Sequence, residues 1–416
     1  MHRPFRLSDS GSTRASAYQF SNKSVRIGDR THVVWLDAVA IVRGRTYDHR
    51  SAAWGETVTI GEGCDNHTNP SLTVDAEGHL RIAYGPHGHW GGWNAGRFKH
   101  SRSLRPNDMG AWSDPVNFGY NATYASMTHT RRGQDVIAYR GGEEPASSML
   151  QWQMPDGGWS SAREIFRQAI PPQYTNMGSH IACDSADVLY TACHFYNVGG
   201  SDNAPVTGDR SRMRSYGVAV LRSADFGVSW TSLAGEPVAV PTLYHRSIAI
   251  PPAGQDMRLC GLMTDSRDRL LALTCDATAA THDMILSVWD GGRWESTNLG
   301  HHAGAYNPIY AVATIDSQDR VHIAWFGAPA DGQGERPSWH SPLNDVFHLI
   351  VQPTGGDATC RMVSEPNDKV SSWLPAISRP GPFHNVDAPV ILYTHGSAGQ
   401  GCSPTDKTEV YCVMPD

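Results

Sequence analysis

The feature that most constrains the fold is a hairpin pattern that returns along the whole chain. Each copy has an apolar strand, a short turn of the form Asp-x-x-Gly or Asp-x-x-Asp, and a second strand that usually ends in an aromatic residue. The seven copies cover residues 24–37, 70–84, 124–140, 180–196, 259–275, 308–325 and 375–393. Such repetition indicates supersecondary units that bury their apolar faces against one another.

The copies also indicate how many strands each unit contains. Dividing 416 residues by seven gives about 59 residues for each unit, enough for four short strands. Period-two apolar runs bounded by Gly, Asp, Asn and Pro dominate, and helical patterns are weak. We therefore expect an all-β chain, a seven-bladed β-propeller of four-stranded antiparallel blades, folded as a single domain over residues 1–416.

One outer turn supports this architecture. Residues 223–230 match S-x-D-x-G-x-x-W, the Asp-box hairpin of sialidase-like propellers. The serine and aspartate cap a tight turn, the glycine permits its backbone, and the tryptophan is expected to pack between blades. The pattern says little about chemistry.

The charge balance argues against a general grip on nucleic acid. The chain has 34 Lys and Arg against 41 Asp and Glu, a formal net charge of −7, and its lysines are only Lys23, Lys99, Lys369 and Lys407. Nucleic-acid binding needs a dense basic stripe. An anionic ligand would instead be held by a local cluster of arginine or histidine.

No segment is expected to associate with a membrane. The longest apolar runs, such as residues 38–42, are far too short to span a bilayer. Residues 1–16 carry basic side chains but no apolar stretch of the kind that signal peptides contain. The sequence leaves open an intracellular protein or one whose leader has been removed.

Hairpin topology decides which polar residues meet. Because the turn joins the two strands of a copy at one end, the residues entering the first strand and leaving the second lie together at the other end. These strands are nearest the axis of a propeller, so that end borders the central depression. The residues expected there are His67, Asn69, His87, His89, Trp90, Tyr124, Arg140, His180, His194, Tyr196 and His302.

Each of these residues also has a purely structural interpretation. A lone histidine at a strand end is more often a hydrogen-bonded structural residue, and Tyr124 could be a packed aromatic. Arg140 could pair with Glu143 or Glu144. His79, on the turn side of its hairpin, serves as an internal control to which no function is assigned. What favours function is the convergence of the set on one face.

Histidine, tyrosine and arginine together favour β-elimination on a uronic acid. Glycoside hydrolysis normally uses two opposed carboxylates, and no such pair is evident at this end of the hairpins. Arg140 would neutralise the uronate carboxylate with its fork of donors. Neutral His67 would accept the C5 proton, and Tyr124 would protonate the departing O4 oxygen or act as a second base.

Two segments resemble a known group of proteins. CDNHTNPSLTVDAEGHLRIAYGPHG (residues 64–88), and ATYASM with DVIAYRGG (within residues 122–142), are similar to the BNR-4 group of seven-bladed propellers that includes the ulvan lyases. Two histidines 20 residues apart are followed by a tyrosine and, 16 residues later, an arginine. The resemblance implies a polysaccharide lyase with four catalytic residues: His67, Tyr124, Arg140 and His87.

The resemblance also implies roles for these residues. His67 corresponds to the catalytic histidine, Tyr124 to the catalytic tyrosine, and Arg140 to the group that neutralises the carboxylate, with His87 assisting nearby. Tyr196 is a further correspondence, for which His194 is an equal alternative by position. The group admits a structural metal ion, but no ligand set is identified here, and no other cofactor is expected.

The expected partner is an anionic polysaccharide, and the protein is expected to act as a monomer. A polymer of this kind is met outside the cytoplasm, so a secreted or periplasmic location is expected. Two alternatives remain: a rhamnosidase-type hydrolase or lyase acting on rhamnose–glucuronate linkages of plant gums, and a non-catalytic carbohydrate-binding propeller. In the second, Trp90 and Trp93 would be stacking platforms.

Two cysteines face each other in the fifth hairpin. Folding residues 259–275 about their turn brings Cys260 and Cys275 roughly opposite. Two free thiols are expected because cross-strand geometry strains a disulfide, which stays as the alternative.

Overall fold

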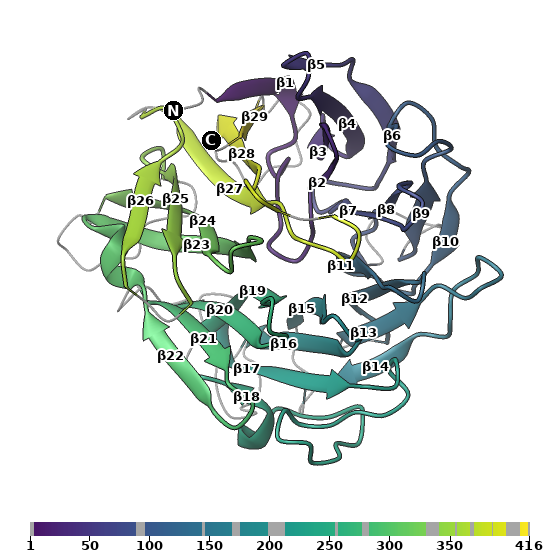
Figure 1. Ribbon diagram of the computed structural model, residues 1–416, viewed down its shortest axis with the longest axis vertical. Coiled ribbons are helices and arrows are strands. Elements are labelled where there is room, and N and C mark those ends of the chain that lie inside the picture. Colours follow the sequence, from purple (N-terminus) through teal and green to yellow (C-terminus); the bar gives the residue numbers. More distant parts are fainter. Residues whose placement is uncertain are drawn as a thin grey trace.

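The computed structural model describes residues 4–88, 96–143, 146–168, 175–198, 213–253, 257–276, 283–329, 341–353, 356–366, 370–384, 386–396 and 408–414. Its strands form radial sheets around a central axis (Figure 1). The innermost strands are β2 (Ser24–Ile27), β7 (Ser71–Val74), β11 (Thr123–His129), β15 (Thr175–Cys183), β19 (Met257–Thr264), β23 (Tyr306–Ile315) and β27 (Ser371–Ile377).

Three further strands complete each blade. The second strands are β3 (Arg30–Asp37), β8 (Leu80–Tyr84), β12 (Asp135–Gly141), β16 (Leu189–Val198), β20 (Leu270–Asp276), β24 (Val321–Pro329) and β28 (Ile391–Gly396). The third are β4 (Ile41–Asp48), β9 (Phe98–Arg102), β13 (Ser147–Trp152), β17 (Met213–Ser223), β21 (Met284–Trp289), β25 (Asp345–Val351) and β29 (Thr408–Val413). The outer strands are β6 (Val58–Glu62) with β5 (Ala53–Trp54), β10 (Val116–Phe118), β14 (Arg163–Phe166), β18 (Ala249–Ile250), β22 (Trp294–Asn298), β26 (Ala358–Met362) and β1 (Phe5–Gly11).

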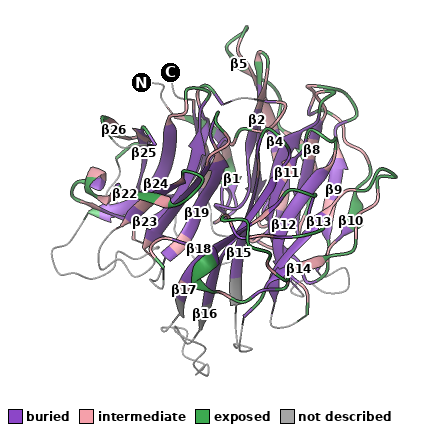
Figure 2. Ribbon diagram, turned by 60° about the horizontal axis from the view of Figure 1, so that its bottom comes forward, coloured by how far each residue is buried: buried purple, intermediate pink, exposed green. Residues whose placement is uncertain are grey.

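This arrangement confirms the predicted all-β propeller with seven blades of four antiparallel strands. Each hairpin copy forms the two inner strands of one blade. The described residues add two short 3-10 helices, η2 (Arg246–Ile248) and η3 (Gly300–Ala303). Strands are buried along most of their length, and exposed positions gather in turns and outer strands (Figure 2).

The ring is closed by pairing of the two ends of the chain. β1 forms the outer strand of the seventh blade against β29, with Phe5 opposite Cys412. A bridge from Gly11 to Asp37 continues this sheet into the first blade. The N- and C-terminal ends accordingly lie side by side (Figure 1). Closure removes the exposed strand edge that an open array would leave.

The channel at the centre of the ring is filled by the segment between β1 and β2. We call residues 12–23 the plug segment; apart from half-buried Arg14, all of its residues are buried. It is tied to the seventh blade, where the Ser16 hydroxyl donates to the Leu374 carbonyl at 2.6 Å. It is tied to the second blade by the Tyr18 amide, which donates to Asn69 Oδ1 at 2.8 Å.

The opposite, turn-side end of the channel holds a cavity of about 420 Å³. Turn residues such as Asp184, Asp265 and Asp316 line it, together with Arg379 from the loop after β27. Arg379 Nη1 donates to the carbonyl of Phe20 in the plug segment at 2.9 Å. The plug segment therefore lies between this cavity and the strand ends at which the polar residues were expected.

Neighbouring blades are clasped by the last aspartate of the Asp-x-x-Asp turn. Asp268 accepts the backbone N–H of Ser185 from the preceding blade at 2.8 Å. Asp319 likewise accepts the Ser266 N–H at 2.8 Å and its hydroxyl at 2.6 Å. These aspartates, like Asp187, have φ near +60°, which the short polar side chain tolerates. The repeated turn thus sets both the hairpin and the contact between blades.

Replacing Asp319 by alanine is expected to lower the free energy of unfolding by about 1–2 kcal/mol. The variant loses two hydrogen bonds to a carboxylate and places an alanine in the left-handed region. Asp319→Asn keeps an acceptor oxygen and tolerates that backbone, so it should cost clearly less. Urea unfolding of both variants measures the difference; equal losses would show that the clasp is not the stabilising feature.

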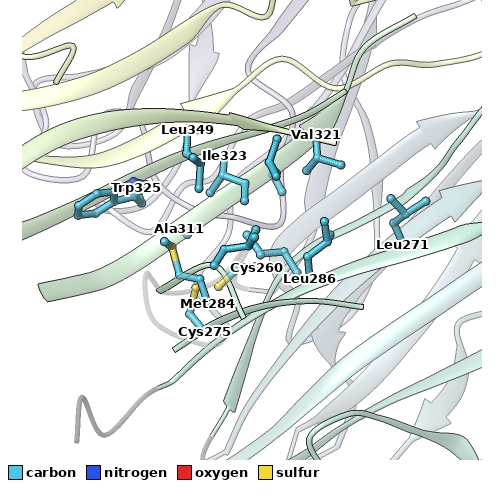
Figure 3. Close-up of a cluster of buried hydrophobic side chains, with 14 of the residues drawn as sticks. Cys260, Leu271, Cys275, Met284, Leu286, Ala311, Val321, Ile323, Trp325 and Leu349 are labelled. Atoms are coloured by element: carbon cyan, nitrogen blue, oxygen red, sulfur yellow. The ribbon is translucent and has the colours of Figure 1, made fainter. Parts of the chain in front are cut away.

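Apolar clusters fill the space between the blades. Between the fifth and sixth blades, Cys260, Leu271, Trp325 and Leu349 are buried in one cluster (Figure 3). Cys260 and Cys275 are free thiols, as expected. A bulge between Leu259 and Gly261 shifts the register, so the strand partner of Cys275 is Arg258.

The Asp-box forms its expected turn. The Ser223 hydroxyl accepts the Gly227 N–H at 2.7 Å, and Asp225 Oδ1 accepts the Ser229 N–H at 2.8 Å. Gly227 has φ of +85°. Trp230 is 2% exposed and packs in a cluster shared by the third and fourth blades.

Candidate active site

The second blade brings two histidines onto one carboxylate. Asp65 and His67 precede β7, and His87 follows β8. Asp65 Oδ1 accepts the backbone N–H of His67 at 2.7 Å and lies 3.2 Å from its Nδ1, whereas Oδ2 lies 2.7 Å from His87 Nδ1. The two imidazoles stack with centroids 3.8 Å apart. The hairpin therefore places both predicted histidines side by side, and Asp65 orients both rings.

The surroundings keep His67 neutral. Burial lowers the pKa of His67 from its usual 6.5 to about 4; Arg14 and His87 add to this effect, and Asp65 opposes it. Burial alone would raise the pKa of Asp65, but hydrogen bonds from both histidines outweigh it and hold that pKa well below its usual range. His67 is therefore neutral over a wider pH range than an ordinary histidine, whose pKa is near 6.5.

The same three residues carry the side-chain types that bind metal ions. Asp65, His67 and His87 form a group of possible ligands whose atoms lie within 4.8 Å of one another. The lone pair of an imidazole nitrogen lies in the ring plane, and these planes are only 19° from parallel. With the ring centroids 3.8 Å apart, planes this close to parallel meet only well beyond the length of a metal–nitrogen bond, so a shared ion would not lie in the plane of both rings and the trio does not fit one. The described residues offer no other such group for a structural ion.

Tyr124 and Arg140 meet at the same end of the third blade. A bulge between Thr123 and Ser126 breaks the pairing of β11 with β12, and Tyr124 has φ of +63°. Bulges and left-handed residues of this kind redirect a side chain. The Arg140 guanidinium lies 5.0 Å from the Tyr124 ring centroid and donates to Thr123 Oγ1 at 3.2 Å.

The second and third blades meet at this point. The ring centroids of His67 and Tyr124 are 6.4 Å apart. The amide of Gly88, next to His87, donates to Thr123 Oγ1 at 2.8 Å. The four residues predicted as catalytic thus lie in one cluster, the mouth cluster: His67, His87, Tyr124 and Arg140.

The plug segment adds two residues that the hairpin pattern did not predict. Arg14 Nη1 lies 2.5 Å from His67 Nε2, and the same nitrogen contacts the Tyr18 hydroxyl. The Tyr18 ring packs edge-on against Tyr124, with centroids 5.0 Å apart. The only signal in the sequence is a basic residue followed by two aromatics, outside the repeat.

The fourth-blade residues lie beside the mouth cluster. His180 and His194 are buried against the Phe20 ring, at 5.4 and 5.9 Å between centroids. Burial lowers the pKa of His194 to about 3, with Arg258 adding to the effect. Both histidines therefore pack as neutral rings around the plug segment.

Tyr196 has a cationic partner from the fifth blade. Arg258 Nη2 donates to the Tyr196 hydroxyl at 3.0 Å, and its guanidinium lies 4.8 Å from the ring centroid. The sequence interpretation did not single out Arg258. Its place at the entry to β19, equivalent to Tyr124 on β11, is the signal that could have found it.

Other predicted binding residues lie apart from the mouth cluster, or their polar atoms are already hydrogen-bonded within the protein. Asn69 is 2% exposed, and its Oδ1 accepts from the Tyr18 amide, Ser21 and Lys23. His302 lies on η3, with its ring tilted against that of His301, and among the described contacts it touches none of the mouth cluster. His89 and Trp90 lie outside the described residues.

Fold and site together define a seven-bladed propeller with imidazole, phenol and guanidinium groups at one end of its channel. The family model described as a BNR repeat-containing family member matches residues 16–302. The chain belongs to this family. None of the described helices is long and apolar enough to cross a membrane.

Two curated relatives are similar to this chain in sequence, and a solved structure is similar to it in fold. An ulvan lyase of Alteromonas sp. (strain LOR) is 23% identical over 222 residues, 47% of this chain and 45% of that protein. Ulvan Lyase-PL25 of Pseudoalteromonas sp. (strain PLSV) is 26% identical over 225 residues, 47% and 44%. The chain spans less than half the length of these relatives. A solved polysaccharide lyase PL25, an ulvan lyase bound to -[GlcA(1-4)Rha3S]-, has a TM-score of 0.75 at 15% identity, covering 99% of this chain and 96% of that one.

Proposed function

We propose that this protein is a polysaccharide lyase that cleaves ulvan, a sulfated polymer of rhamnose and uronic acid, by β-elimination at the uronate. The observation that carries the proposal is the mouth cluster, in which neighbouring blades bring imidazole, phenol and guanidinium groups within ring-contact distance. Similarity to ulvan lyases in sequence and in fold supports the same reaction.

The proposed reaction divides the work among these groups. Arg140 holds the uronate carboxylate and lowers the cost of forming charge beside it. Neutral His67, oriented through Nδ1 by Asp65, accepts the C5 proton on Nε2. The C–H electron pair forms the C4–C5 double bond, the C4–O4 bond breaks, and Tyr124 protonates the departing oxygen. His87 supports His67 through the shared carboxylate.

Substrate binding is proposed to continue beyond the reacting sugar. Tyr196, held by Arg258, offers a phenol and a cation beside His194, which suits further anionic sugars. His180, His302, His89 and Trp90 remain proposals for contacts with the polymer. Asn69 is better explained as the anchor of the plug segment, because its acceptor oxygen already takes three donors.

Two-carboxylate hydrolysis receives less support. Among the described residues, the carboxylate that touches the mouth cluster is Asp65, and both its oxygens accept from histidine. An opposed pair of carboxylates is what hydrolysis normally requires. We further propose that the protein acts outside the cytoplasm, where such a polymer is met, and as a monomer.

Incubation with ulvan is expected to produce near-ultraviolet absorbance from an unsaturated uronate end. Gum arabic, which also contains rhamnose–glucuronate linkages, is run in parallel. Release of reducing sugar without this absorbance would show that the protein cleaves the linkage by hydrolysis and not by elimination. Binding to the polymer without either product would show that the protein is a non-catalytic carbohydrate-binding propeller.

A further inference from the structure

Arg14 is the half-buried residue of an otherwise buried plug segment. Its neighbours hold the backbone on both sides: before it the Ser12 N–H donates to the Leu36 carbonyl at 3.0 Å, and after it the Ala15 carbonyl accepts the Leu36 N–H at 3.1 Å. The side chain points to the second blade, where Nη1 lies 2.5 Å from His67 Nε2. A segment that closes the channel thus also delivers a guanidinium to the proposed base.

The contact between Arg14 and His67 fixes which of the two groups donates the hydrogen bond. Guanidinium has only donors and stays charged in proteins, so His67 Nε2 must be the acceptor. The Nδ1 proton then points to Asp65 Oδ1, 3.2 Å away. Arg14 and Asp65 therefore select one neutral tautomer of His67, with the lone pair of Nε2 covered by Arg14.

We propose that Arg14 is a positioning residue that covers the lone pair of His67 in the free protein and moves to the carboxylate of an incoming uronate, so that the base is uncovered only when an anionic sugar is bound. This rests on the proposed lyase function. A carboxylate takes two parallel hydrogen bonds from a guanidinium and is a stronger acceptor than neutral imidazole. A neutral sugar has no group that competes in this way, so Arg14 stays hydrogen-bonded to His67 Nε2 when such a sugar binds.

The groups facing His67 determine the sign of the expected pH effect. Asp65 and His87 face it from the second blade, Arg14 and Tyr18 from the plug segment, and Tyr124, backed by Arg140, from the third blade. Arg14 lowers the pKa of His67, and Asp65 raises it. Removing the Arg14 charge and admitting water should therefore raise that pKa.

The test is a titration of His67 by NMR in Arg14→Ala and Arg14→Lys, together with pH profiles of kcat/KM on ulvan. Arg14→Ala should raise the pKa of His67, and with it the acidic limb of the profile, by about 1 pH unit or more, whereas Arg14→Lys keeps the charge and should stay closer to the native value. Arg26→Ala, at the hairpin turn of the first blade, is the matched control and should change neither. An unmoved His67 pKa in Arg14→Ala overturns the proposal.

A second measurement tests the transfer itself. In the native protein, sodium glucuronate should shift the His67 imidazole resonances, glucose should not, and Arg14→Ala should lose the difference. Equal responses to both sugars, or no response to glucuronate, overturn the transfer. Because these NMR readings need no turnover, they can succeed even where ulvan is not cleaved, which separates failure of the proposed function from failure of this inference.

Discussion

Replacing His67 by alanine is expected to lower kcat on ulvan by about 10²–10⁴-fold, the range for loss of a positioned general base. The imidazole is the group whose neutral state and tautomer are both set by its surroundings, through Asp65 on one side and Arg14 on the other. Alanine removes the proton acceptor but leaves the Asp65–His87 hydrogen bond in place. The initial rate of near-ultraviolet absorbance measures the loss.

The matched control is His79→Ala. His79 lies at the turn end of the same hairpin, where its Nδ1 bonds to the Ser103 carbonyl at 2.7 Å. This variant should keep near-native turnover while losing a little stability. If both histidine variants kept their rates, or both lost them equally, the assignment of His67 would be wrong.

The blades could be predicted from sequence because their signals are local. A turn such as Asp265–Asp268 caps itself, since Asp265 Oδ1 accepts the N–H groups of Arg267 and Arg269. Alternating apolar residues on both sides then define the paired strands. Once the hairpins are known, the ends of each pair must meet, which is why His67 and His87 were expected together.

The plug segment could not be predicted in the same way. Arg14 reaches a histidine 53 residues later, and nothing in residues 12–23 repeats or alternates. Its place is set by ring closure, which depends on pairing β1 with the last strand of the chain. Contacts of this range have no local signal.

Asn69 shows that the plug segment also limits what can be predicted about residues of the hairpins. Hairpin geometry correctly predicted its position near the mouth of the channel, but not what occupies its side chain. Its Oδ1 is taken by the plug segment, including the fully buried Lys23 ammonium at 2.8 Å. Burial lowers the pKa of Lys23 well below its usual value, and Arg379 adds to this effect. A residue near a site is therefore not available to substrate when a distant segment has already used its polar atoms.

Tyr124 is the residue for which activity and stability are expected to separate most clearly. Its ring is 4% exposed and packs against Tyr18, against Phe20 and beneath the Arg140 guanidinium. Its backbone, with φ of +63°, lies where non-glycine residues pay a conformational cost. Backbone strain held at a packed position commonly marks a functional site, and here it directs a phenol to the mouth cluster.

Tyr124→Phe should lower kcat by about 10²-fold or more, because the departing O4 oxygen loses its proton donor. The ring, its stacking with Arg140 and the strained backbone all persist, so the free energy of unfolding should change by less than about 1 kcal/mol. Absorbance assays and urea unfolding of the same preparation give both numbers.

Tyr139→Phe is the opposite case on the neighbouring strand. The Tyr139 hydroxyl is fully buried and donates to Gln151 Oε1 at 2.6 Å, away from the mouth cluster. Its loss leaves a buried acceptor without this donor and should cost about 1–2 kcal/mol of stability, with turnover retained. Loss of activity in Tyr124→Phe alone, and of stability in Tyr139→Phe alone, is the pattern that elimination chemistry at Tyr124 requires; the reverse pattern would make Tyr124 an ordinary packed aromatic.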